Sequence, residues 1–103
     1  DSRDFALNNL IVLAMADGVY QKEEEEFVRE TAKNLGYNLT KISGLLALAQ
    51  TGALSIKMPE DEKSRRKIYS LMKKIAEADG NVSPQEQAVL DQVKRDYLPE
   101  ATA

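Results

Sequence analysis

Apolar residues recur along this chain at intervals of three and four positions, which is the spacing of one face of an α-helix. No two segments show the paired alternation of apolar and polar residues that is typical of a β-sheet. We therefore predict an all-α fold, a compact bundle of five to seven helices. The expected helices cover about residues 3–16, the stripe 27–35, residues 39–49, residues 60–78, and the segment from Pro84 toward Pro99.

Each apolar stripe is expected to face a common core. Gly36 follows the second stripe as a helix-terminating glycine, and Pro84 suits the first turn of the last helix. The residues expected to point inward are Leu7, Leu10, Ile11, Ala14 and Met15; Phe27, Val28, Thr31, Ala32 and Leu35; Leu39, Ile42, Leu45, Leu46 and Ala49; Ile68, Leu71, Met72, Ile75 and Ala76; and Val89, Leu90, Val93 and Tyr97.

Residues 53–59 are expected to form a connector between the third and fourth helices. Leu54, Ile56 and Met58 alternate with other residues, as they would in a β-strand. A lone strand would find no partner strand in this chain, so we interpret the segment as irregular.

The composition narrows the chemistry that the chain can perform. Its 103 residues, of which 43% are hydrophobic, suffice for one domain covering residues 1–103. The absence of cysteine and histidine excludes disulfides, thiolate nucleophiles and imidazole chemistry. A net charge of −3 disfavours nucleic acid as a partner.

The two ends of the sequence and its longest apolar block bear on location. The block from Leu10 to Ala16 is far too short to span a membrane. No signal-peptide pattern is present, so we expect a cytoplasmic domain. The chain begins at Asp1 without a methionine, as expected of an excised domain or a processed product.

A short motif occurs twice. Residues 14–18 read Ala-Met-Ala-Asp-Gly and residues 76–80 read Ala-Glu-Ala-Asp-Gly, an offset of 62 positions (79 − 17). The match continues, because Glu24 corresponds to Glu86 at the same offset. Each copy reads as a helix, an Asp-Gly turn and a second helix, which indicates an internal duplication with halves of about 1–50 and 51–103.

The same residues fit part of a calcium-binding EF-hand loop, and that interpretation fails. With the Asp-Gly pair at loop positions five and six, positions one and three fall on Leu13 and Met15 in the first copy, and on Ile75 and Glu77 in the second. An EF-hand needs oxygen ligands at both positions, and three of these four residues are apolar.

The duplicated motif resembles the TerB-like family of tellurite-resistance proteins. The family pattern is an apolar helix ending in Ala-x-Ala-Asp-Gly, followed by a short turn and Ser-x-x-Glu at the start of the next helix. The second copy matches with Ser83 and Glu86, whereas the first has Gln21 in the place of the serine. The resemblance implies an α-helical domain with pseudo-symmetric halves, a bacterial stress-response role, and acidic residues that bind a divalent cation.

Asp17, Glu24, Asp79 and Glu86 are the candidate metal ligands, because all four continue the apolar stripes of their helices and should project inward. Carboxylates without histidine or cysteine favour Ca²⁺, Mg²⁺ or Mn²⁺. A structural interpretation stays open: Ser83 and Glu86 form a capping box, and the aspartates can bond their own turns. In that case no cofactor is expected.

Three further sets of residues are interpreted as structural. The four acids Glu23–Glu26 suit the first turn of a helix, where the dipole favours negative charge. The four tyrosines (Tyr20, Tyr37, Tyr69 and Tyr97) are expected to be half-buried. A basic stretch is expected to wrap around its helix as a solvated surface, with an acidic partner or lipid headgroups as the alternative. It comprises Lys63, Arg65, Arg66, Lys67, Lys73 and Lys74.

Three functional hypotheses follow, in decreasing order of preference. The first is a non-enzymatic TerB-like module that binds a divalent cation or a protein partner within a larger assembly. The second is a scaffold domain whose acids only cap helices. The third is a metal-dependent hydrolase, which would have to act without histidine and without an obvious nucleophile. The sequence does not indicate the oligomeric state.

Overall fold

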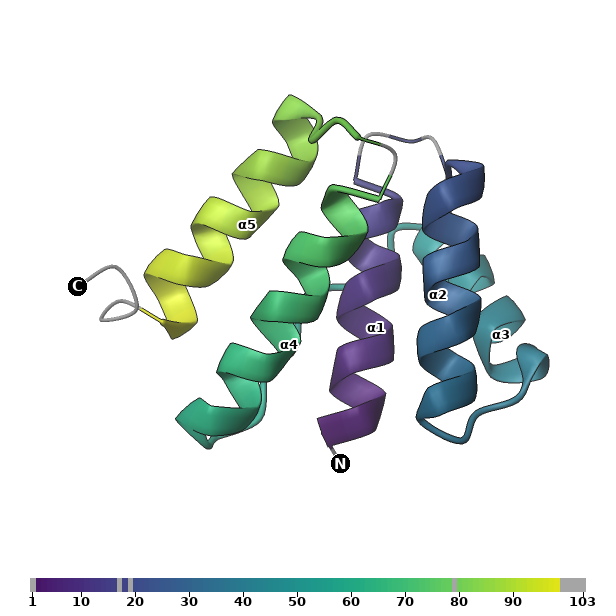
Figure 1. The fold of residues 1–103 in the computed structure, drawn as a ribbon, viewed down its shortest axis with the longest axis horizontal. Helices are drawn as coiled ribbons and strands as arrows, with labels where there is room; N and C mark the ends of the chain where they lie inside the picture. Colours follow the sequence, from purple (N-terminus) through teal and green to yellow (C-terminus); the bar gives the residue numbers. More distant parts are fainter. Residues whose placement is uncertain (1, 17, 19, 79, 99–103) are drawn as a thin grey trace.

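The described part of the chain is entirely helical (Figure 1). The computed structural model describes residues 2–16, 18, 20–78 and 80–98, and in these residues there is no β-strand. None of the helices in these ranges is long and apolar enough to cross a membrane. The predicted fold class is therefore confirmed for the described residues. The helices are α1 (Ser2–Ala14), α2 (Lys22–Asn34), α3 (Leu39–Gln50), α4 (Glu62–Ala76) and α5 (Pro84–Tyr97).

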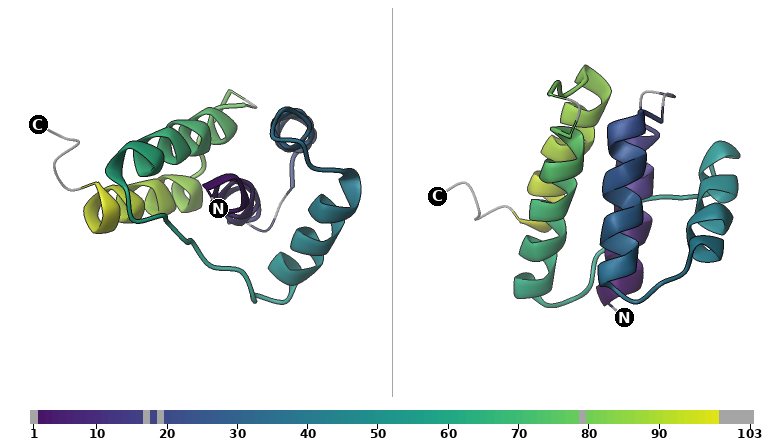
Figure 2. Two further views of the ribbon diagram at one scale, coloured as in Figure 1. Left: turned by 90° about the horizontal axis from the view of Figure 1, so that it is seen from below. Right: turned by 45° about the vertical axis from the view of Figure 1, so that its right-hand side comes forward.

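Helix α1 lies at the centre of the bundle. It packs against each of the other four helices, with α4 and α5 on one side and α2 and α3 on the other (Figure 2). A helix that is surrounded by partners needs apolar residues on more than one face. Leu7, Leu10 and Ile11 are buried as predicted, but so are Ala6 and Leu13, which lie outside the predicted stripe.

The two helices α4 and α5 bury the faces that their apolar spacing predicts. Ile68, Met72 and Ile75 of α4 are buried, as are Leu90 and Val93 of α5. Both helices begin at a residue with a capping side chain, Asp61 for α4 and Ser83 for α5. Cap and stripe together define where each helix begins and which way it faces.

Helix α3 is less buried than its sequence predicts. Of its expected inward residues only Ile42 is fully buried. Leu39 is 62% exposed, so the prediction that Leu39 points inward is wrong. Leu48 is also exposed. The physical reason is position: α3 packs against α1 and α2 at the edge of the bundle and meets neither α4 nor α5. A helix at the edge of the bundle contacts too few neighbours to bury the full width of its apolar stripe.

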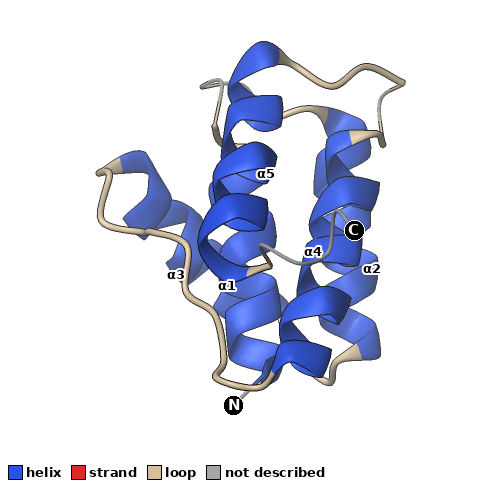
Figure 3. Cartoon of the chain, turned by 90° about the vertical axis from the view of Figure 1, so that its left-hand side faces the viewer, coloured by secondary structure: helices blue, strands red, loops and turns tan. Residues whose placement is uncertain are grey.

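The connector between α3 and α4 is irregular, as predicted, and runs along the bundle without pairing to a strand (Figure 3). Its backbone is instead bonded by a side chain of α1. The Nδ2 of Asn9 donates to the carbonyl of Lys57 at 2.7 Å, and the N–H of Lys57 donates to Asn9 Oδ1 at 2.9 Å. Asn8 Nδ2 donates to the carbonyl of Ser55 at 2.9 Å. An asparagine amide offers one donor and one acceptor side by side, so it can substitute for the backbone of a partner strand.

The basic residues of α4 were predicted to wrap around the helix, but most of them lie on one face. The basic residues Lys63, Arg66, Lys67, Lys73 and Lys74 are all exposed, and Arg65 alone is half-buried. Arg65 turns back to the start of the helix, where it donates to the carbonyls of Pro59, at 3.2 Å, and Glu60. The exposed five recur at helical spacing and therefore occupy one outer face.

Candidate functional site

The glycines of the two Asp-Gly motifs have the same conformation and the same backbone hydrogen bond. Gly18 has φ of 81° and donates its N–H to the carbonyl of Met15 at 3.0 Å. Gly80 has φ of 87° and donates to the carbonyl of Glu77 at 3.0 Å. Positive φ is strained for any residue with a Cβ, which explains the glycine in both turns.

The helix starts after these turns also match. Gln21 precedes α2 with φ −67° and ψ 152°, and Ser83 precedes α5 with φ −68° and ψ 157°. The Gln21 N–H donates to Glu24 Oε1 at 3.1 Å, and the Ser83 N–H donates to Glu86 Oε1 at 3.0 Å. In the second turn the Glu86 N–H donates in return to Ser83 Oγ at 3.1 Å, which completes the predicted capping box.

Both glutamates of the candidate site are buried, as their spacing predicts. Glu24 is 2% exposed and Glu86 is 3% exposed. This burial distinguishes Glu24 from the other residues of the acidic run 23–26. Glu23 and Glu26 are exposed, whereas Glu25 is half-buried and forms an ion pair with Arg29.

The second oxygen of Glu86 is the most unusual atom of the site. Glu86 Oε1 accepts the capping bond, but Oε2 is buried and has no hydrogen-bond partner among the described residues. A buried polar atom without a partner costs about 1–3 kcal/mol, and more when it carries charge. A cation bound at Oε2 would remove that cost, and helix capping alone does not.

The structure separates the two copies of the motif. The first residues of α2 and α5 lie at the same end of the bundle (Figure 1). However, α2 and α5 do not contact each other in the described part of the chain, because α1 and α4 lie between them. Glu24 and Glu86 therefore lie at two different turns, on helices that do not contact each other.

Asp17 and Asp79, the other two candidate ligands, lie outside the described residues. Among the described residues no three acidic side chains gather as a metal-binding group would. Each glutamate is seven positions after its aspartate in the sequence (24 − 17 and 86 − 79). The four-residue candidate set thus stays a prediction, of which the structure describes the two buried glutamates.

Tyr20, in the first turn, was expected only to pack. It is half-buried, but its hydroxyl is buried and has no hydrogen-bond partner. Burial, together with the nearby carboxylate of Glu25, raises the pKa of Tyr20 to about 12. The corresponding position in the second turn is Val82 (20 + 62), an apolar residue that has no such cost.

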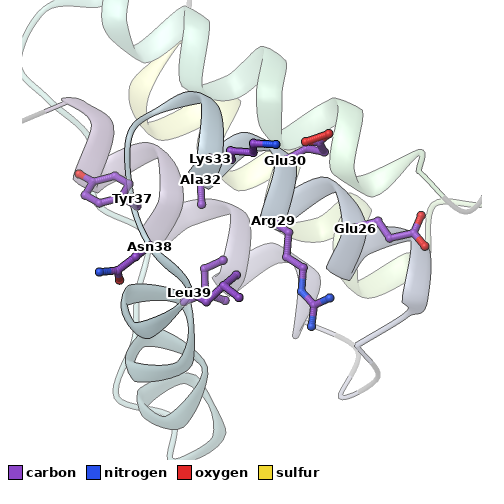
Figure 4. A pocket seen from close by; sticks show the side chains of 9 residues that line it. Glu26, Arg29, Glu30, Ala32, Lys33, Tyr37, Asn38 and Leu39 are labelled. Carbon is purple, nitrogen blue, oxygen red and sulfur yellow. The ribbon is translucent and has the colours of Figure 1, made fainter.

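A groove of about 660 Å³ lies between α2 and α3 (Figure 4). Its α2 wall carries two acids and two bases, and the loop with Tyr37 and Asn38 closes one end. The opposite charges balance, so the groove has no net preference for a cation or an anion. Its lining residues are Glu26, Arg29, Glu30, Ala32, Lys33, Tyr37, Asn38, Leu39 and Ile42.

Comparison of the chain with protein-family models, with curated proteins and with solved structures found no match.

Proposed function

We propose that this chain is a non-enzymatic, TerB-like module that binds a divalent cation at its Asp-Gly turns. The observation that supports the proposal most directly is the buried Oε2 of Glu86, which has no partner. Capping accounts for Oε1 and leaves Oε2 unexplained. In the proposed site Glu86 Oε2 and the carboxylate of Asp79 are ligands, and Glu24 and Asp17 take the same roles in the first turn.

The proposed internal duplication is supported by hydrogen bonds that recur at one offset. The bond from Gln21 N–H to Glu24 Oε1 reappears 62 positions later, from Ser83 N–H to Glu86 Oε1. The bond from the turn glycine recurs at the same offset and with the same length of 3.0 Å. Two turns of identical design are the expected result of a duplicated helical hairpin.

The chemistry of the ligands selects the class of ion. Only oxygen ligands are available at these turns, since the chain has neither histidine nor cysteine. Hard oxygen ligands suit Ca²⁺, Mg²⁺ and Mn²⁺. A site with so few protein ligands leaves room for water or for an oxygen of a partner. We therefore favour a role within a larger assembly, with a protein partner, in a bacterial cytoplasmic stress response of the kind that the resemblance implies.

The rival proposal is a scaffold domain whose acids only cap helices. It is favoured by the capping bonds themselves, because Glu24 and Glu86 each already accept an N–H at the start of their helix. The two proposals differ in what a neutral residue at position 86 would do. Glutamine keeps an oxygen for the capping bond and replaces Oε2 with an amide that binds no cation.

The test is thermal unfolding of wild type and Glu86→Gln, each with a chelator and with millimolar Ca²⁺, Mg²⁺ or Mn²⁺. Binding to the folded state alone stabilises it by about 2.7 kcal/mol at an ion concentration of 100 Kd. We expect at least one ion to raise the Tm of wild type, and Glu86→Gln to abolish most of that rise. Glu23→Gln removes the exposed acid that immediately precedes Glu24 and should leave the rise intact.

A second variant separates the two proposals in the absence of metal. Asp79 follows the C-terminus of α4, where the helix dipole disfavours negative charge. If Asp79 is a ligand, Asp79→Asn should abolish the metal-dependent rise and leave the metal-free protein equally stable or slightly more stable. If Asp79 only bonds its own turn, the same change should lower the Tm with or without metal. A wild-type Tm that no divalent ion changes would contradict the metal proposal.

A further inference from the structure

The outer face of α4 is a continuous basic surface, which we call the basic stripe. Its members recur at intervals of three and four positions and are all exposed. The stripe covers 12 residues of helix and is about 16 Å long, at 1.5 Å for each of its 11 steps. The acidic residues nearest its two ends are Glu62, the first residue of α4, and Glu77, which follows the last. The stripe consists of Lys63, Arg66, Lys67, Ser70, Lys73 and Lys74.

The charges of the basic stripe are almost entirely uncompensated by the described residues. Arg66 lies 3.5 Å from Glu62, and both side chains are more than half exposed, so water screens that pair. The four lysines form no ion pair with any residue of the described ranges. Five positive charges on one face are unusual in a chain whose net charge is −3. The face therefore has a preference for anions that the whole protein lacks.

The shape of this face favours a flat partner. The stripe lies on the convex side of a helix, opposite the buried residues Ile68, Met72 and Ile75. The groove between α2 and α3 and the groove beside α5 are both lined by residues outside the stripe. A peptide or a small anion needs a concave site for specific contacts, whereas a plane of charged headgroups needs only side chains that project outward.

We propose that the basic stripe of α4 docks this protein onto an anionic membrane surface. The lysines would contact lipid headgroups, and no part of the chain would enter the bilayer. The acidic residues elsewhere do not prevent this, because the protein measures 37 × 29 × 24 Å and its far side lies well beyond the Debye length of about 8 Å at physiological salt. The absence of aromatic residues from the stripe argues against single-stranded nucleic acid, which binds by stacking as well as by charge.

Each lysine or arginine near an anionic lipid surface strengthens binding by about fivefold. Replacing three stripe residues with glutamine should therefore weaken vesicle binding by about a hundredfold. The variant is Lys67→Gln/Lys73→Gln/Lys74→Gln, since glutamine keeps the helix propensity of lysine. The matched control is Lys22→Gln/Lys33→Gln/Lys57→Gln, which removes the same charge from exposed positions outside α4.

The experiment is co-sedimentation of the 103-residue chain with phosphatidylcholine vesicles, with and without an equal share of phosphatidylserine. A chelator is present throughout, so that the result does not depend on the proposed metal sites. We expect wild type and control to bind only the vesicles that contain phosphatidylserine, and about 1 M salt to release them. The α4 variant should not bind, while its circular dichroism and Tm match those of the control.

Three results would overturn the proposal. Wild type could fail to bind phosphatidylserine vesicles, or bind both kinds of vesicle equally. The control could lose as much binding as the α4 variant, which would mean that net charge matters and the stripe does not. Finally, an oligonucleotide or an acidic peptide could bind through the stripe in a titration while vesicles do not, which would assign the face to a different class of partner.

Discussion

The turn between α1 and α2 and the turn between α4 and α5 match in their glycines and in the backbone of their helix starts, but their side chains differ. Both contain a glycine with φ above 80°, and both lead to a buried glutamate. The second turn begins its helix with serine and proline, where the first has Gln21 and Lys22. Only the second has a glutamate oxygen among the buried atoms that lack a partner. Backbone geometry is thus common to both turns, and the capacity to bind a ligand is expected to be greater in the second.

The largest effect should come from the glycines that the turns share. No atom lies within 4 Å of where a Cβ would be added at Gly18 or Gly80, so Gly→Ala at either position tests backbone strain alone. We expect each to lower the free energy of unfolding by about 1–2 kcal/mol, the usual cost of an L-residue in the left-handed region. Chemical denaturation measures this directly.

Gly44 is the control for that comparison. It lies inside α3 and has equally open surroundings. Gly44→Ala should stabilise the protein by about 0.5–1 kcal/mol, because alanine loses less backbone entropy in a helix. If Gly18→Ala were harmless and Gly80→Ala costly, the two turns would not share a backbone requirement.

A smaller difference is expected at the helix starts. Ser83→Ala removes the Oγ that accepts the Glu86 N–H and should cost about 1 kcal/mol. Gln21→Ala should cost only a few tenths of a kcal/mol, since glutamine is not a favoured N-cap residue. Equal losses in denaturant titrations would show that the side chain of Gln21 caps α2 as well as serine caps α5.

The smallest effect on stability is expected at Tyr20 in the first turn. Tyr20→Phe removes a buried hydroxyl without a partner and should raise the Tm slightly. Tyr37→Phe should lower it slightly, because the Tyr37 hydroxyl donates to Asp4.

A pKa of Tyr20 raised from 10.0 to about 12 means that its neutral form stabilises the folded state below pH 10, and that this contribution is lost as the pH rises toward 12. The pKa of Tyr69 is also raised, by burial. Absorbance of tyrosinate during an alkaline titration should therefore show one fewer late-ionising tyrosine in Tyr20→Phe than in wild type.

Local signals in the sequence predicted where the helices begin and end. The sequence did not predict where each helix lies in the bundle. Ser83, Pro84 and Gly36 predicted helix ends correctly, because caps depend on neighbouring residues only. The exposure of Leu39 could not be predicted, because it depends on α3 lying at an edge. Likewise, the central place of α1 could not be predicted, because Asn8 and Asn9 are polar residues, which are usually exposed, and here they are buried.

The candidate site shows the same division. Spacing from the apolar stripes predicted that Glu24 and Glu86 are buried, and this is confirmed. The free oxygen of Glu86 was not predictable, because which of two carboxylate oxygens finds a donor depends on the packing of other helices. The inward turn of Arg65, which leaves one basic stripe on α4, depends on the carbonyl of Pro59 in the connector and is equally invisible in a helical wheel.

The amide pair between Asn9 and Lys57 has a consequence for how folding can be observed. Its members are 48 residues apart, so it closes only when the connector docks on the central helix. Loops of this length close late in folding, after local helices have formed. The Lys57 amide lies in a segment without secondary structure, yet its hydrogen should exchange with solvent as slowly as those of the core, since it is released only when α1 and the connector separate. One slowly exchanging amide in an irregular segment thus reports whether the two halves of the chain are joined.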